Sequence, residues 1–338
     1  MKYKVLNTEL NINKWSLFVK NHPLGNIFQT SEMFLSYKNT KKYEPIILSI
    51  LNEKDEILGI LLAIIQKEHS GLFGYFSARS ITIGGPLVID NNLEILDILL
   101  NEYKKFIKGR AIYSQFRNLW EWGNEEKKVF LKYGFTFDSH LDIIISLENS
   151  SDELWKNLSR DRKKSIKKGN SYLKTELIDF NEYFNRIYLL LKNVYRRIGL
   201  PLPEKMLFYN AMFYLGNINA IKTFGAFKDN KLVGVRIELC YNNLIYDWYA
   251  GADDSFLEYR PNDVLLWNIF LWGKDNGFKY FDFGGAGKPN KPYGVRDYKL
   301  KFGGKLVNFG RFELVHKPII YKFGIFALKN YKIIKKIL

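Results

Sequence analysis

The apolar positions of the chain form strand-like runs and helical stretches, and the same order of them occurs twice. Residues 43–51 and 56–65 are β-rich apolar runs that meet across a short polar turn, which predicts a hairpin. A glycine-rich passage over 78–89 follows, and residues 91–109 then place apolar side chains at helical spacing. Residues 111–147 add a strand, a short helix and a final strand.

The second half repeats this order. Residues 219–227 and 231–241 predict another hairpin, and 243–253 take the place of the glycine-rich passage. An apolar helix over 260–277 and a strand over 279–285 complete the repeat. Two copies of one mixed unit explain the pattern most simply. The predicted fold is α/β, with two tandem domains that each hold a mixed β-sheet flanked by helices, an order typical of GNAT acyltransferases.

The repeat also predicts the domain boundaries. We expect a first domain over 1–147 and a second over 148–316, with the last 22 residues, 317–338, packing back on the first domain. These last residues contain six lysines and no acidic residue, interleaved with apolar side chains. Such a pattern could lie on an anionic bilayer, but docking on the first domain with the lysines facing water is the favoured interpretation.

A strongly basic stretch separates the two halves. Ser150 or Ser151 predicts the start of a helix, because acidic residues that suit a helix N-terminus follow directly. Further along, basic residues spaced three, four and seven apart fall on one helix face: Arg160, Lys163, Lys164 and Lys167. An anion bound across this face would relieve their mutual repulsion, whereas a solvated face of a lysine-rich protein needs no ligand. Both interpretations stay open.

Composition narrows the partners and the compartment. The 338 residues carry 51 Lys and Arg against 35 Asp and Glu, and the net charge of +16 favours RNA, nucleotide diphosphates or an anionic membrane surface. Cys240 is the only cysteine, which fits a reducing cytoplasm. No secretory signal and no long apolar span are visible. We therefore expect a soluble, cytoplasmic monomer, with a peripheral position at the inner membrane face left open.

The side chains present exclude several kinds of chemistry. The sequence has no HExxH pair, no GxSxG elbow and no GxxxxGK[ST] loop, and its four histidines are scattered: His22, His69, His140 and His316. Neither a metal site nor a covalent intermediate is predicted, which leaves catalysis by positioning two substrates. Asp247 is a candidate proton acceptor; the alternative is a strand-end aspartate paired with a neighbouring cation.

Coenzyme A is disfavoured as a cofactor, and none is expected. A standard GNAT enzyme binds its pyrophosphate with a Q/R-x-x-G-x-G/A loop that opens a helix, because free backbone N–H groups there bind phosphate. The corresponding "RPNDVL" from Arg260 places Asp263 at the first glycine position and Leu265 at the small-residue position. The Asp263 carboxylate would repel the phosphate.

The stretch "YFDFGGAGKPNKPYGVRDYKLKFGG", residues 280–304, is the most unusual in composition. Its start predicts a buried strand, and its middle a loop in which Gly284 and Gly285 permit close backbone approach. Its end is predicted to be a second strand that presents Tyr298 and Lys299. The basic and aromatic residues gathered here favour a binding loop over a purely structural connection.

With "FQTSEMFLSYK", "SRDRKKSIKKGNSYLKTEL" and "YRRIGLP", this stretch resembles the Fem family of peptidoglycan-bridge aminoacyltransferases and the FemAB-like proteins of the GNAT superfamily. The resemblance covers nearly the whole chain. It implies two GNAT-like domains with a cleft between them. It also implies transfer of an amino acid from aminoacyl-tRNA to an amino group of a peptidoglycan or other cell-envelope precursor.

The resemblance also assigns site residues. Lys38 and Arg197 match the family's basic residues that contact the precursor's diphosphate. Tyr298 and Lys299 match an aromatic-lysine pair near the acceptor end of the tRNA, with Tyr in place of the usual Phe. The remaining candidates are Gly284 and Gly285 on the donor side, and Tyr249, Tyr293 and Arg296 as substrate contacts.

Two other functions are compatible with the same sequence. The first is an N-acyltransferase of surface glycan synthesis that uses coenzyme A or acyl-carrier thioesters. The second is a catalytically inactive GNAT-fold protein that binds RNA through its basic helix. The identity of the donor separates all three.

Overall fold

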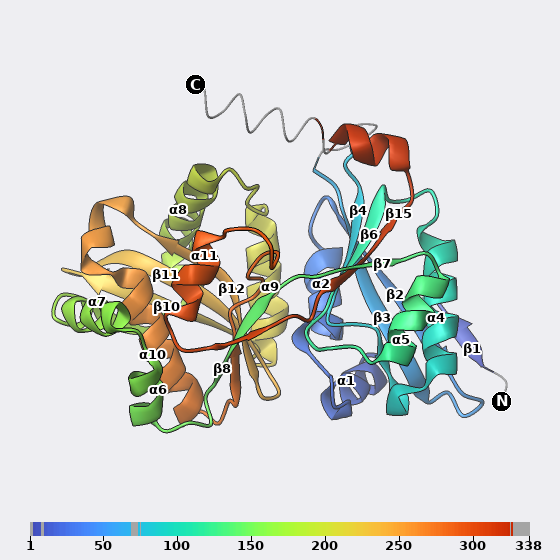
Figure 1. The fold of residues 1–338 in the computed structure, drawn as a ribbon, viewed down its shortest axis with the longest axis horizontal. Helices are drawn as coiled ribbons and strands as arrows, with labels where there is room; N and C mark the ends of the chain where they lie inside the picture. Colours follow the sequence, from blue (N-terminus) through green and yellow to red (C-terminus); the bar gives the residue numbers. More distant parts are fainter. Residues whose placement is uncertain (1–2, 8–9, 69–73, 75, 325, 327–338) are drawn as a thin grey trace. The chain divides into compact units, whose positions relative to one another are not determined.

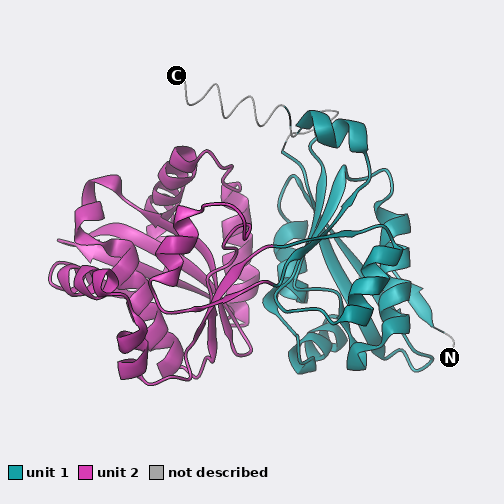
Figure 2. Ribbon diagram, in the orientation of Figure 1, with its two compact units in different colours: residues 1–139, 309–338 teal, residues 140–308 magenta. Residues whose placement is uncertain are grey.

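The computed structural model describes residues 3–7, 10–68, 74, 76–324 and 326. The chain forms two compact units, Met1–Ser139 with Phe309–Leu338 (unit 1) and His140–Asn308 (unit 2), shown in two colours in Figure 2. Each unit is a mixed β-sheet flanked by helices (Figure 1). The predicted α/β class with two tandem units is therefore confirmed.

The sheet of unit 1 has the strand order β1-β2-β3-β4-β6-β15-β7, and β5 pairs with β3 beside this path. Strands β4 and β6 run parallel, and the other neighbours are antiparallel. The strands are β1 (Lys4–Leu6), β2 (Tyr43–Leu51), β3 (Ile57–Gln66), β4 (Arg79–Ile83), β5 (Leu87–Val88), β6 (Tyr113–Arg117), β7 (Thr136–Asp138) and β15 (Arg311–Val315).

Helix α4 (Leu93–Ile107) provides much of the core of unit 1. Asn92 caps its start, and its apolar residues recur at helical spacing, so one stripe is buried against β2 and β3. Strands β2 and β3 are almost continuously apolar because helices cover both of their faces. The other helical segments are α1 (Ile12–Asn21), η1 (Ile27–Gln29), α2 (Ser31–Lys38), η2 (Ile89–Asn91) and α5 (Asn124–Lys132).

The sheet of unit 2 has the order β14-β8-β13-β12-β11-β10-β9. Strands β12 and β13 run parallel, and the other neighbours are antiparallel. The strands are β8 (Asp142–Ser146), β9 (Lys174–Leu177), β10 (Ile221–Lys228), β11 (Lys231–Tyr241), β12 (Leu244–Ala252), β13 (Tyr280–Asp282) and β14 (Lys305–Val307).

Two helices of unit 2 pack on opposite faces of its sheet. A side chain at Gly234 would meet Pro261 of α10 (Pro261–Asp275), whereas one at Gly251 would meet Leu190 of α8 (Phe180–Ile198). Because Gly251 pairs with the residue after Gly234, the two positions point to opposite sides. The remaining segments are α6 (Ser151–Asn157), α7 (Arg160–Asn170), α9 (Lys205–Asn217), η3 (Asp254–Tyr259) and α11 (Gly294–Leu300).

Two strands lie in a different unit from the one that the predicted domain bounds gave them. Strand β8, expected in the domain over 1–147, pairs with β13 and β14 in unit 2. Strand β15, expected in the domain over 148–316, pairs with β6 and β7 in unit 1. The sequence pattern of β8 or β15 is compatible with either sheet, so periodicity alone did not reveal which strands each one pairs with.

Two local predictions change in the structure. The basic stretch between the halves is two helices: Ser150 caps α6 in a capping box with Glu153, and Ser159 caps α7. Residues 295–304 were predicted as a strand, but Gly294–Leu300 form helix α11. The Tyr298 ring packs 5.4 Å from that of Phe302, which follows the helix and is buried in the core.

The described part of the C-terminal segment belongs to unit 1. Residues 318–324 form a helix after β15 (Figure 1). The Tyr321 ring lies 5.3 Å from that of Tyr113, and its hydroxyl donates a 2.6 Å hydrogen bond to Glu313. Residues 325 and 327–338 of the predicted packing segment lie outside the described residues. Over the ranges given above, helices long and apolar enough to cross a bilayer are absent.

Candidate functional site

The parallel strands of unit 2 separate after three residue pairs. Leu244–Tyr246 of β12 pair with Tyr280–Asp282, which is all of β13, and β12 then continues to Ala252. Over the described residues, β12 therefore has no strand partner on this side beyond Tyr246, and we call this segment the open edge of β12. In unit 1 the equivalent strands β4 and β6 stay paired along their whole length.

A β-bulge shapes the same strand. Glu238 of β11 pairs with Asp247, but Ile237 pairs with Tyr249, so Trp248 is an extra residue in β12. Bulges of this kind re-aim side chains and occur often near functional sites. Here the bulge places Asp247 on the face that also carries Glu238 and Arg236.

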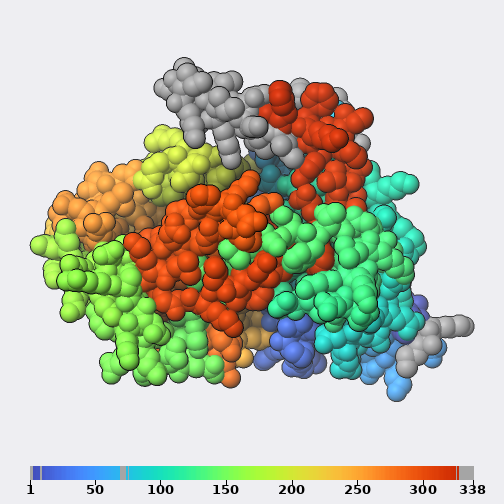
Figure 3. Space-filling view, in the orientation of Figure 1, coloured from blue at the N-terminus to red at the C-terminus, as the bar shows by residue number. Residues whose placement is uncertain are grey.

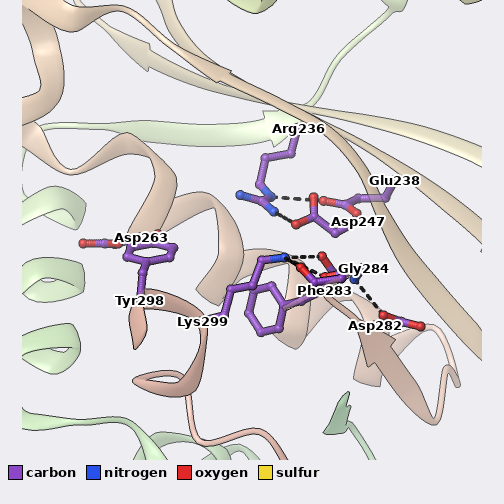
Figure 4. A network of polar contacts seen from close by, with 10 residues as sticks. Arg236, Glu238, Asp247, Asp263, Asp282, Phe283, Gly284, Tyr298 and Lys299 are labelled. Carbon is purple, nitrogen blue, oxygen red and sulfur yellow. Dashed lines mark hydrogen bonds and ion pairs between the residues drawn. The ribbon is translucent and has the colours of Figure 1, made fainter. Parts of the chain in front are cut away.

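Arg236, Glu238 and Asp247 form a buried ionic cluster at the open edge (Figure 4). The Arg236 guanidinium donates a 3.1 Å hydrogen bond to Glu238 and forms an ion pair with Asp247. Burial and the negative charge of Asp247 raise the pKa of Glu238 well above its usual value. Its second carboxyl oxygen has no hydrogen-bond partner among the described residues. Asp247 therefore acts as the counter-ion of Arg236, which supports the second of its two predicted interpretations.

Lys299, at the end of α11, holds the loop that follows β13. Its ammonium donates hydrogen bonds of 2.8, 2.7 and 3.1 Å to the carbonyl oxygens of Phe283, Gly284 and Gly285. An ammonium has three N–H groups, so all of them are used. Burial lowers the pKa of Lys299, although nearby carboxylates including Asp247 oppose this effect.

Gly284 is required by its position. Its φ of 61° is left-handed, and a Cβ atom there would lie 2.9 Å from the Tyr246 hydroxyl oxygen. Its N–H donates a 2.7 Å hydrogen bond to Asp282, whose side chain is buried. Burial and the adjacent Asp142 raise the pKa of Asp282 well above its usual value. The close approach predicted for Gly284 is thus present against β12.

A second polar cluster, formed by Asp263, Tyr298 and Arg162, lies at the start of α10. Asp263, in the first turn, accepts a 2.7 Å hydrogen bond from the Tyr298 hydroxyl and lies 2.5 Å from the Arg162 guanidinium. That guanidinium also stacks on the Tyr298 ring, 5.1 Å from its centre. Burial and the Asp263 charge raise the pKa of Tyr298. In this arrangement the Tyr298 hydroxyl faces its own chain, and stacking of its ring on a substrate stays a prediction.

The candidates on α8 and β12 lie close to one another. The Tyr249 ring packs 5.7 Å from that of Tyr195 and 4.9 Å from that of Phe208. Burial and the charge of Asp247 raise the pKa of Tyr195 to about 12. Two residues further along α8, Arg197 is exposed and forms an ion pair with Asp254. Arg197 is therefore held near the open edge by an interaction that water can reach.

Other predicted contacts have structural partners. Arg296 donates 2.8 Å hydrogen bonds to the carbonyl oxygens of Lys288 and Lys291, so its guanidinium fixes the loop before α11. Tyr293, the residue preceding that helix, is exposed. Lys38, at the end of α2, is exposed with its ammonium 5.9 Å from the Phe34 ring. Because Lys38 belongs to unit 1 and Arg197 to unit 2, their joint action stays a prediction.

The basic face of α7 is only partly free for a ligand. Arg160, Lys164 and Lys167 are exposed. Lys163 is half-buried, and its ammonium donates a 3.0 Å hydrogen bond to the carbonyl oxygen of Lys156 in α6. Three of the four predicted residues therefore face solvent, and Lys163 instead connects α7 to α6.

Sequence reasoning missed several members of the two clusters. Arg236 and Glu238 interrupt the apolar strand "KLVGVRIELCY" two residues apart, which places opposite charges on one buried face. Arg162 lies in a run of basic residues, so the sequence did not distinguish it as the partner of Asp263. A charge in a buried strand was the signal available for Arg236, Glu238 and Asp282. Groups of three or more His, Cys, Asp or Glu side chains that could hold a metal ion are absent from the described residues.

Comparisons with known proteins agree with this architecture. Residues 156–300 match the acetyltransferase (GNAT) domain family. A UDP-N-acetylmuramoylpentapeptide-lysine N(6)-alanyltransferase from Weissella viridescens is 21% identical over 308 residues, which cover 83% of this chain and 85% of that protein. The crystal structure of FemX has a TM-score of 0.74 at 15% identity and covers 96% of this chain and 99% of that one. A tandem GNAT protein from the clavulanic acid pathway has a TM-score of 0.55 at 9% identity, covering 93% and 98%.

Proposed function

We propose that this chain, which is a FemABX-like member of the GNAT superfamily, is an aminoacyltransferase that acts on a peptidoglycan precursor. The similarity to the alanyltransferase from Weissella viridescens covers most of this chain and most of that protein, and it supports this activity. The two-unit fold and the polar clusters at the open edge of β12 and at the start of α10 are compatible with it. The amino acid donor is proposed to be aminoacyl-tRNA, and the acceptor an amino group of the precursor.

The observation that carries the choice of donor is Asp263 at the start of α10. Free N–H groups at a helix start favour a phosphate, but this helix places its own buried carboxylate in the first turn. Tyr298 and Arg162 hold that carboxylate in place. A coenzyme A pyrophosphate bound there would face an anion. The arrangement therefore supports a donor other than a coenzyme A thioester.

The chemistry proposed for the site depends on orientation. A neutral amine of the acceptor attacks the carbonyl carbon of the aminoacyl ester, the bond to the ribose oxygen breaks, and the proton of the amine passes to that oxygen. The ester is already activated, so holding both groups in line supplies much of the rate. In our proposal Lys299 and Gly284 give the loop after β13 one fixed shape, against which the donor end is placed. The ion pair with Asp247 keeps the Arg236 guanidinium in a fixed position beside this loop.

Two basic regions are proposed to bind the charged substrates. Arg197 and Lys38 would contact the diphosphate of the precursor, with the Arg197 guanidinium leaving the exposed Asp254 for the phosphate oxygens. The exposed lysines and arginine of α7 would contact the tRNA backbone. Because both substrates are made in the cytoplasm and the precursor continues to the membrane, we place the protein at the cytoplasmic side of the inner membrane.

Binding of the two donor classes to the purified protein tests this proposal. Aminoacyl-tRNA should be retained in a filter-binding assay, and acetyl coenzyme A should give no heat in calorimetry at concentrations that saturate ordinary GNAT enzymes. Tight binding of acetyl coenzyme A without retention of tRNA would instead support an acyl-thioester-dependent enzyme. Retention of tRNA without transfer to any precursor would support an RNA-binding protein without catalytic activity.

A further inference from the structure

The helix over residues 318–324 presents apolar side chains to solvent, which is the reverse of an ordinary docked helix. Ile319 and Phe323 are 74% and 71% exposed, and Phe326, which is also helical, is 65% exposed. Spacings of four and three residues place all three on one side of the helix. The opposite side carries Tyr321, which packs on Tyr113 and bonds to Glu313. Tyr321 thus anchors the segment to unit 1, and Ile319, Phe323 and Phe326 stay outside.

The charged residues of the C-terminal segment itself have one sign. Residues 317–338 contain six lysines and no acidic residue. Lys322, exposed beside Phe323, is the described lysine on the outward side. Figure 3 shows this red segment at the surface of the molecule. An apolar stripe beside an exposed lysine, in a segment whose sequence holds lysines and no acidic residue, has the composition of a helix that lies in the interface of an anionic bilayer.

We infer that the surface formed by Ile319, Lys322, Phe323 and Phe326 docks the protein on an anionic lipid bilayer. Burial of two or three large apolar side chains supplies affinity, and lysine adds attraction to anionic headgroups. An RNA partner fits less well, because Ile319 has no ring to stack on a base and the surface has no arginine. The inference goes beyond the proposed transfer reaction and does not depend on it.

Vesicle flotation of the full chain tests the docking surface. Vesicles of phosphatidylcholine with phosphatidylglycerol should carry the protein, and vesicles of phosphatidylcholine alone should carry about tenfold less. Phe323→Ser should lower binding to the anionic vesicles about tenfold. The matched control is Phe213→Ser on α9, which removes an equally exposed phenylalanine (64%) from another surface and should leave binding unchanged. Lys322→Gln should lower binding about fivefold, whereas Lys54→Gln on an exposed turn should not.

The outcomes separate this surface from the proposed enzyme activity. Transfer to a water-soluble, nucleotide-linked acceptor should be the same for Phe323→Ser and the unmodified protein, because the assay contains no membrane. Equal binding to neutral and anionic vesicles, or equal loss in Phe213→Ser and Phe323→Ser, would overturn the inference. So would a loss of tRNA binding in Phe323→Ser with vesicle binding intact, which would reassign the surface to RNA.

Discussion

The Lys299 ammonium donates a 2.7 Å hydrogen bond to the carbonyl oxygen of Gly284, a residue whose backbone is left-handed and packed against β12. This contact joins the end of α11 to the loop after β13 at the open edge of β12. Two further carbonyl oxygens of the same loop share the ammonium. One lysine therefore fixes three consecutive peptide groups, and the predictions below test what that arrangement does.

Replacement of Lys299 should impair use of the donor. Lys299→Ala removes three hydrogen bonds from the loop, and we expect kcat/KM for aminoacyl-tRNA to fall about a hundredfold because orientation of the ester is lost. Steady-state transfer at saturating acceptor measures this. Lys301→Ala, which removes an exposed lysine two residues away, is the control and should change the value less than twofold. Equal activity in the two variants would remove Lys299 from the site.

The position of Gly284 should tolerate no side chain. Gly284→Ala adds backbone strain of about 1 kcal/mol at a positive φ and a clash with the Tyr246 hydroxyl of about 1–3 kcal/mol. Gly277→Ala has a φ of 80° with no atom within 4 Å of the new Cβ, so it isolates the strain alone. Urea denaturation should show the larger loss for Gly284→Ala, and Tyr246→Phe should recover part of it. Equal losses at both glycines would contradict the packing described.

The ion pair between Arg197 and Asp254 should compete with the acceptor. Arg197→Ala should raise KM for a diphosphate-bearing acceptor about tenfold, and Asp254→Asn should lower it, because the guanidinium is then released. Both side chains are exposed, so folding should change little. Arg196→Ala tests the neighbouring arginine. A KM that depends on Arg196 and not on Arg197 would move the diphosphate contact by one residue. Lys38→Ala should raise the same KM, and no change there would remove Lys38 from the site.

The contribution of Asp282 to the stability of the protein should fall as the pH rises from about 4. Its pKa is higher in the folded state than in the unfolded state, since burial and Asp142 disfavour its charge. Its contribution is therefore complete below about pH 4 and is lost as the pH rises through the folded-state pKa. Asp282→Asn should flatten this part of the curve of unfolding free energy against pH. Asp297→Asn, at an exposed position on α11, should not, and parallel curves for all three proteins would refute the assignment.

Much of the fold was predictable because the spacing of apolar residues follows the same order in both halves of the chain. The hairpin of β10 and β11, and helices α4 and α10, follow from local periodicity. The sheets that β8 and β15 join did not follow, since contacts distant in sequence decide which sheet a strand joins. Helix α11 was mistaken for a strand because aromatic residues such as Tyr298 favour strands.

The candidate site was predictable only in part for a similar reason. Gly284, Asp263 and Lys299 stood out as residue types in an unusual context, and each has a defined place at the open edge or at the start of α10. What each residue contacts was not visible in the sequence. Tyr298 bonds to its own chain because burial obliges its hydroxyl to find a partner. Arg296, which is only partly buried, bonds to the carbonyl oxygens of the neighbouring loop.

The central claim is that the donor is aminoacyl-tRNA and the acceptor a peptidoglycan precursor. The direct test incubates the purified protein with a panel of radiolabelled aminoacyl-tRNAs and a nucleotide-linked muramoyl-pentapeptide, and follows the mass of the acceptor. The account predicts a gain of one aminoacyl residue with at least one tRNA, and no gain with acetyl coenzyme A as the donor. An acetyl gain from coenzyme A, with every aminoacyl-tRNA inactive, would contradict it.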